Sequence, residues 1–124
     1  MYKVIPEDVS QFILQHIDSI AQIEGLLLFC ADPGRGWDAE TIAPALFISE
    51  SQAASILTQL TEQGFIIRAG DSYCYQPKTS ELKAMVERTA ALYRQYLIPV
   101  TNLIHSKSKS RVQEFADAFK LRKD

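Results

Sequence analysis

Five polar side chains recur at helical spacing near the middle of the chain, and their types suit hydrogen bonding to a large partner. Hydroxyl and amide groups can bond the edges of DNA bases, and they can equally bond the polar groups of another polypeptide. Apolar residues alternate with them at spacing i, i+3, i+4 and i+7, which places the polar set on the outer face of an amphipathic helix. The polar face comprises Ser51, Ser55, Thr58, Gln59 and Glu62, and the apolar stripe comprises Ala53, Ile56, Leu57 and Leu60.

A second group with chemical capacity is the carboxylate set of Asp32, Asp38 and Glu40, beside the loop Gly34-Arg35-Gly36. Catalysis by these carboxylates would need a histidine or a nucleophile at a matching spacing, and none accompanies them. The loop also lacks the lysine and serine or threonine that follow a phosphate-binding loop. Acids at a loop and at a helix start are expected as caps. We therefore predict no enzyme activity, no metal site and no cofactor.

Three further residues could bind a ligand, and each has a simpler interpretation. His16 lies in an apolar stripe and could be a ligand or a pH sensor. No second ligand type shares its spacing, so we expect a partly buried histidine with a hydrogen-bond partner. Cys30 and Cys74 stand 44 positions apart in apolar surroundings without a CxxC motif. We predict that both are small buried residues rather than metal ligands or a disulfide.

The polar face belongs to a series of predicted elements between Trp37 and Pro77. A first helix spans 38–47, a second spans 49–63, and two strands, 65–68 and 73–76, flank a turn at 69–72. Ser49 and Gln52 are spaced as a capping box for the second helix, and Gly64 would end that helix in a left-handed conformation.

The first of these helices is expected to start at Asp38, a favourable N-cap residue. Its periodicity predicts that Ile42, Ala45 and Leu46 point inward. Trp37, which precedes it, is expected to form a short strand contact beside the hairpin.

This order of helix, tight turn, helix and β-hairpin resembles the winged helix-turn-helix module, and most closely that of MarR-type regulators. The resemblance implies that the outer face of helix 49–63 is the surface that enters the DNA major groove. It further implies that the hairpin is a wing, which here carries Arg68 and Asp71. In MarR-type proteins, helices that flank the module form a homodimer.

Two helices are predicted before the module, within residues 7–31. The first follows Pro6, and the second starts after a capping signal at Ser19 and Gln22. The second helix is apolar on nearly all sides, which predicts that it is the buried centre of the domain.

After the module, one apolar stripe continues from Ser80 to Ile104, with Pro99 inside it. We expect a kink near residues 95–97, because proline removes an amide and clashes with the carbonyl four residues back. A short helix is predicted at 111–121. These helices, within residues 80–121, are the expected dimerisation elements. The predicted dimer or partner stripe comprises Tyr93, Tyr96, Leu97, Val100, Phe115 and Phe119.

Charge separates the two functions that the module suggests. Residues 1–62 hold nine acidic and two basic residues, and residues 63–124 hold eleven basic and six acidic residues. MarR-type proteins usually carry basic residues on the second helix and at the wing tip, since DNA affinity comes largely from lysine and arginine on phosphates. Helix 49–63 has no basic residue. This favours a protein partner, and a MarR-like DNA-binding transcriptional regulator is the alternative.

The whole sequence is therefore expected to be one mostly α domain, residues 1–124, with a small β-hairpin wing. It would comprise a winged helix-turn-helix core, a long C-terminal helix and a short terminal helix. No apolar run reaches the roughly 20 residues that span a bilayer, and Met1 to Ser10 lacks the apolar centre of a signal peptide. We expect a cytoplasmic, non-enzymatic regulatory module that forms a homodimer, binds a macromolecule and has no membrane partner.

Overall fold

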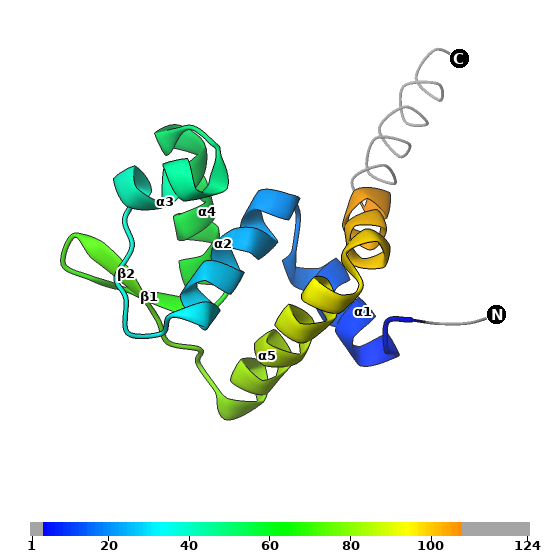
Figure 1. The fold of residues 1–124 in the computed structure, drawn as a ribbon. Coiled ribbons are helices and arrows are strands. Elements are labelled where there is room, and N and C mark those ends of the chain that lie inside the picture. Colours follow the sequence, from blue (N-terminus) through cyan, green and yellow to red (C-terminus); the bar gives the residue numbers. More distant parts are fainter. Residues whose placement is uncertain (1–3, 108–124) are drawn as a thin grey trace, which may run out of the picture.

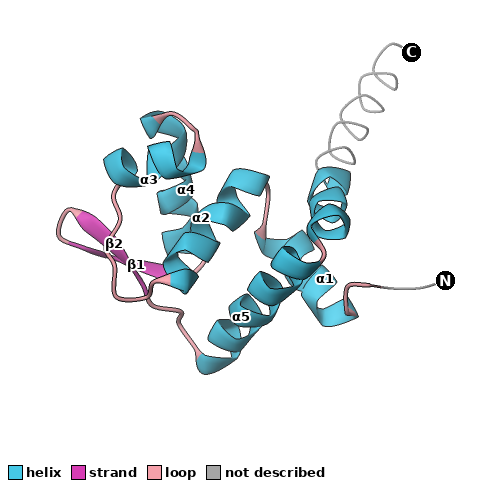
Figure 2. Ribbon diagram, in the orientation of Figure 1, coloured by secondary structure: helices cyan, strands magenta, loops and turns pink. Residues whose placement is uncertain are grey.

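The computed structural model describes residues 4–107 of the chain and shows a mostly helical fold with one small antiparallel hairpin (Figures 1 and 2). The predicted helix 111–121, with Phe115 and Phe119, lies outside the described residues. The elements run in the order α1 (Glu7–His16), α2 (Ile20–Ala31), α3 (Ala39–Leu46), α4 (Glu50–Glu62), β1 (Ile66–Ala69), β2 (Ser72–Tyr75) and α5 (Ser80–Gln95), and a further helical stretch covers residues 97–107.

Helix α2 lies at the centre of the fold, between the α3 and α4 pair on one side and α5 on the other (Figure 1). Its Ile23, Leu26 and Phe29 are fully buried. Gly25 allows α4 and α3 to approach closely, because a Cβ there would touch Ile56 at 3.4 Å and Leu46 at 3.5 Å. The predicted central position of this helix is confirmed, but only one of its sides is fully buried, since Leu27 and Leu28 are half-buried.

The caps of α3 and α4 follow from their sequences. Asp38 accepts a hydrogen bond from the Thr41 amide at 2.8 Å, and Thr41 completes a capping box. Ser49 and Gln52 form the predicted capping box on α4. Helix α4 ends before Gly64, which has a φ of 84° as expected.

The inner face of α3 differs from the prediction. Ile42 and Leu46 are buried as expected, but Ala45 is exposed and Ala43 is buried in its place. In a helix of only eight residues, Ala43 lies next to Ile42 and one turn before Leu46, so it shares their inward side.

The hairpin pairs Ile66 with Tyr75 and Ala69 with Ser72, and a two-residue turn at Gly70 and Asp71 connects its strands (Figure 2). Gly70 has a φ of 66°, a conformation that this tight turn requires and that glycine adopts without strain. The predicted contact of Trp37 is confirmed as a bridge to Tyr73, closed by two backbone hydrogen bonds of 2.9 and 2.7 Å.

The long C-terminal stripe is interrupted rather than kinked. Helix α5 ends at Gln95, Tyr96 is non-helical with φ −126° and ψ 57°, and helix resumes over residues 97–107. The break moves Pro99 into a first turn, where the amide that proline lacks would have no helical partner. The irregularity lies where the sequence predicted it, but the prediction of a single kinked helix is wrong, because two helices are present.

Buried and half-buried polar contacts tie the helices together. Gln22 is fully buried, and its side-chain Nε2 donates to the His16 carbonyl at 2.9 Å and to Gln63 Oε1 at 3.0 Å. The side-chain Oε1 of Gln22 accepts a hydrogen bond from the backbone amide of Asp18 at 2.7 Å. The loop between α1 and α2 is thereby fixed to the end of α4.

Within residues 4–107, two ion pairs connect α5 and the helical stretch 97–107 to the N-terminal part of the chain. Arg88 on α5 pairs with Asp8 on α1, with one bond of 3.1 Å from Nη2 to Oδ1. Lys107 pairs with Asp18 at 2.8 Å. Helix α5 and residues 97–107 therefore pack on their own chain, and Val100 and Ile104 are fully buried there.

Candidate functional site

The outer face of α4 is the surface that the sequence singled out, and the structure exposes it. Ser51, Ser55, Thr58, Gln59 and Glu62 are all exposed. The opposite stripe, Ala53, Ile56, Leu57 and Leu60, is buried as predicted and holds the helix in place.

Four of these five residues border one shallow hollow. Ser51, Ser55, Thr58 and Gln59 line it together with Ala54, and it is open to solvent. Glu62 lies one turn beyond and does not line it. Because the lining side chains are mostly short, the helix backbone is close to the surface, and a partner element could approach it closely.

The hydrogen-bonding groups of the hollow are largely unused. The Thr58 hydroxyl donates to the Ala54 carbonyl at 3.0 Å, one turn earlier in its own helix. The side chains of Ser51, Ser55 and Gln59 make no hydrogen bond to the described part of the chain, residues 4–107. Their donors and acceptors are available to a partner.

Helices α3 and α4 carry no positive charge of their own. The sequence contains no lysine or arginine from residue 36 to residue 67, a stretch that includes α3 and α4 entirely. The same stretch holds four acids: Asp38, Glu40, Glu50 and Glu62.

The hairpin adds one arginine, which is bonded to its own hairpin. Arg68 Nε donates to the Gly70 carbonyl at 3.1 Å, and its guanidinium lies 6.0 Å from the centre of the Tyr73 ring. Asp71 at the hairpin tip is exposed. The hairpin thus holds one basic and one acidic residue and has no net formal charge.

The stripe that the sequence assigned to a partner is mostly occupied within the chain. Tyr93 is 7% exposed, and its hydroxyl donates to Glu24 Oε2 at 2.7 Å. Burial is the main cause that raises the pKa of Tyr93 above its usual value, and the hydrogen bond to Glu24 raises it further. Val100 is fully buried, Tyr96 is half-buried, and Leu97 is 48% exposed. Tyr93 and Val100 are thus not available on the surface, contrary to the expectation of a free stripe.

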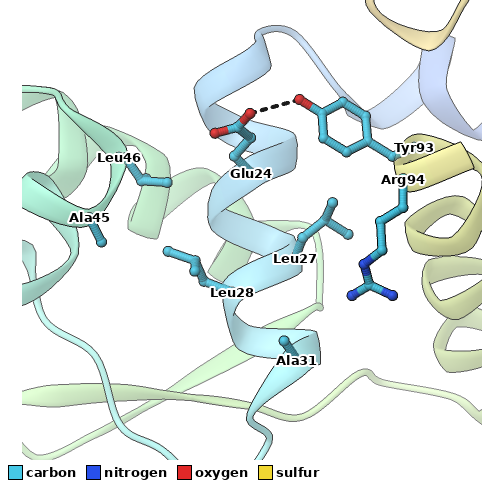
Figure 3. Close-up of a pocket in the computed structure, with 8 residues that line it drawn as sticks. All are labelled: Glu24, Leu27, Leu28, Ala31, Ala45, Leu46, Tyr93 and Arg94. Carbon is cyan, nitrogen blue, oxygen red and sulfur yellow. Dashed lines mark hydrogen bonds between the residues drawn. The ribbon is translucent and has the colours of Figure 1, made fainter. Parts of the chain in front are cut away.

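An apolar groove lies between α2, α3 and α5, and we call it the α2–α5 groove (Figure 3). Its volume is about 310 Å³. Leucine and alanine side chains form its floor, the hydrogen-bonded Tyr93 and Glu24 border one end, and the Arg94 guanidinium lies beside Leu27 and Ala31 (Figure 3). The lining residues are Glu24, Leu27, Leu28, Ala31, Ala45, Leu46, Tyr93 and Arg94.

No pattern in the sequence indicates this groove or the exposure of Phe47, which follows Leu46 of α3. Phe47 is 95% exposed and left-handed, with φ 57° and ψ 44°. The sequence placed Phe47 as the last residue of a helix, and no pattern there distinguishes a phenylalanine that caps a helix from one that continues it. The groove combines residues more than 45 positions apart, such as Glu24 and Tyr93, and no local signal could have joined them.

The residues considered for other chemistry have structural partners. His16 is half-buried, its Nδ1 lies 3.2 Å from the Phe12 carbonyl, and its ring stacks on Phe12. Burial, and secondarily the charge of Lys107, lowers its pKa. Asp38 serves as the cap of α3, as predicted.

The two cysteines are free, and each is half-buried rather than fully buried as predicted. Within residues 4–107, no group of three or more histidine, cysteine, aspartate or glutamate side chains is placed to hold a metal ion. In that same range, no single helix is long and apolar enough to cross a membrane.

No protein-family model, curated protein or solved structure matches this chain.

Proposed function

We propose that this chain is a non-enzymatic winged-helix regulatory module, similar in architecture to MarR-type regulators, that binds a protein partner through the outer face of α4 and acts as a homodimer. The order α3, α4, β1, β2 and the short connection between α3 and α4 support the winged-helix assignment. The bridge from Trp37 to the hairpin supports it further.

The observation that carries the proposal is the charge of the exposed face. A winged-helix protein that binds DNA places lysine and arginine near phosphates, and the affinity depends on how many phosphates they neutralise. Here residues 36–67 contain no basic residue and four acids. At physiological salt, charges are screened within about 8 Å, so only nearby basic residues add to the charge of this face, and Arg68 and Lys78 lie beside Thr61 and Gly64 at its C-terminal end.

The remaining chemistry of the face suits a polypeptide. Ser51, Ser55 and Gln59 offer unused hydrogen-bonding groups around a hollow with short side chains. Protein interfaces combine close packing with about one hydrogen bond per 100–200 Å², which this surface can provide. Because a fold does not fix a function, the proposal depends on this face and not on the architecture alone.

The alternative is a MarR-like DNA-binding transcriptional regulator, and the exposure of Gln59, Ser55 and Thr58 supports it. Glutamine can pair with adenine, and hydroxyl groups can bond several bases. Such contacts specify a sequence, but contacts to phosphate must position them. In this alternative, basic residues after Gln63 or a dimeric arrangement would supply those phosphate contacts.

Site-specific photo-crosslinking in the native cytosol tests the proposal. A benzophenone side chain at Ser55 should give protein adducts that are lost when Ser51→Arg is added to the same chain. The same probe at Glu87, an exposed position on α5, is the matched control and should not give those adducts. Adducts to nucleic acid alone at Ser55, or identical protein adducts at both positions, would contradict the proposal.

A further inference from the structure

Phe47 is a large apolar side chain that the fold of its own chain does not use. It is 95% exposed, and it occupies a left-handed conformation that is unfavourable for a non-glycine residue. Glycine or asparagine would suit this turn better on both counts. An outlier of this kind indicates a function outside the isolated fold.

The backbone that carries Phe47 is held firmly. The Phe47 amide donates to the carbonyls of Ala43 and Pro44, and the Ile48 amide donates to the Ala43 carbonyl at 3.1 Å. The ring therefore projects from an ordered turn between two helices. Little conformational freedom would be lost when it is buried, which favours a role as an anchor.

The charges near Phe47 indicate what would receive it. Glu50 is exposed three residues later, and no basic residue lies between 36 and 67. A surface complementary to this turn would offer an apolar pocket for the ring and a cation at its edge for Glu50.

The α2–α5 groove has this chemistry. Leu27, Leu28 and Leu46 provide apolar walls, and the exposed Arg94 lies at its edge (Figure 3). Its volume of about 310 Å³ can hold a phenyl ring, since an apolar cavity of about 150 Å³ holds benzene.

We propose that two copies of this chain associate by inserting Phe47 of each into the α2–α5 groove of the other, with Glu50 of each facing Arg94 of the other. Phe47 directly follows Leu46, which lines the groove, so the inserting residue and the receiving groove are neighbours on one molecule. A two-fold axis can then form both contacts at once, as in a closed isologous dimer.

The inference rests on the dimeric state proposed above and gives it an interface. It differs from most of the interface expected from the sequence, since Tyr93 borders the α2–α5 groove but Leu97 and the buried Val100 do not line it.

Sedimentation of the full chain over a concentration series tests the interface. Phe47→Asn should weaken dimerisation at least tenfold while the melting temperature of the monomer is unchanged or higher, because asparagine tolerates the left-handed turn. Leu28→Glu should weaken it similarly from the groove side, with the helical circular dichroism retained. Leu97→Asp, at another exposed apolar position, is the matched control and should change the dimer constant less than about threefold.

A charge exchange tests the register. Glu50→Arg and Arg94→Glu should each weaken dimerisation, and the two together should restore at least half of the lost free energy. A dimer that Phe47→Asn leaves unchanged, or charge variants that do not compensate, would overturn this interface while leaving a dimer by another surface intact. A wild-type chain that stays monomeric at about 0.1 mM would overturn both dimer proposals, and binding of another protein through α4 would stand independently.

Discussion

At the scale of single residues, the side chains that contribute most to the fold are those that form hydrogen bonds between segments far apart in the sequence. Gln22 was predicted only as a partner in a helix cap. The structure confirms a cap at Ser19, which accepts a hydrogen bond from the Gln22 amide, but it directs the Gln22 side chain elsewhere. That side chain joins the loop before α2 to the end of α4 through Gln63. Local spacing cannot reveal a bond across 41 positions.

Gln22→Ala should lower the free energy of unfolding by about 2–3 kcal/mol, because it removes a fully buried side chain that forms three hydrogen bonds, to Asp18, His16 and Gln63. Urea denaturation followed by circular dichroism measures this change. Gln11→Ala, at an exposed position on α1, is the control and should change stability by less than about 0.5 kcal/mol. Equal effects at the two positions would show that the Gln22 network is not stabilising.

His16 should make stability fall at acidic pH. Its pKa is lowered in the folded chain from the usual 6.5, mainly by burial and then by Lys107, with Asp18 opposing. The unfolded chain therefore binds a proton more tightly, so the free energy of unfolding decreases as the pH drops below about 6.5. His16→Gln should show a smaller decrease between pH 7 and 5 than wild type, and His105→Gln, at an exposed position, should match wild type. The same decrease in wild type and His16→Gln would exclude His16 as the cause.

At the scale of elements, the sequence predicts well where a local rule applies. The capping box of α4, the buried stripe on its inner face and the two-stranded hairpin were all derived from short-range patterns, and all are present. The prediction of one long helix after the hairpin was wrong, because its sequence pattern allows two structures. A proline in a helical stripe can kink a helix or lie in the first turn of a new one, and here Tyr96 is non-helical and separates two helices.

Gly64 ends α4 and turns the chain into β1, and its φ of 84° makes it a sensitive position. Gly64→Ala should lower the free energy of unfolding by about 1–2 kcal/mol, because alanine is strained in this conformation and its Cβ would meet the Lys78 side chain. Gly34→Ala is a suitable control, since nothing lies within 4 Å of a Cβ there and its φ is not positive. Thermal denaturation should show a clear loss for Gly64→Ala and little change for Gly34→Ala; a similar result for both would refute the argument from backbone strain.

At the scale of the whole molecule, two surfaces with different chemistry emerge. The α4 face is polar, neutral to acidic and hollow, whereas the α2–α5 groove is apolar with a cation at its edge. The first was predictable because all its members lie within one helix. The second was not, because it requires α2, α3 and α5 to meet, and periodicity gives the inward side of each helix but not which helices face one another.

The uneven distribution of charge along the sequence corresponds to different helices of the fold. The part without basic residues includes α3 and α4, while α5 carries Lys83, Arg88 and Arg94. Arg88 is paired with Asp8, and that ion pair lowers the pKa of Asp8. The basic side chains of α5 thus belong to a different helix from the face that a DNA-binding module would present to phosphate.

Titration of the chain into a fluorescent random-sequence duplex at several salt concentrations tests whether the α4 face serves a protein rather than DNA. If it serves a protein, the dissociation constant should be weaker than the roughly 1–100 µM range of non-specific DNA binders at physiological salt, with little dependence on salt. Sub-micromolar binding that weakens steeply as salt rises would contradict the claim, because it would require several lysine or arginine contacts to phosphate.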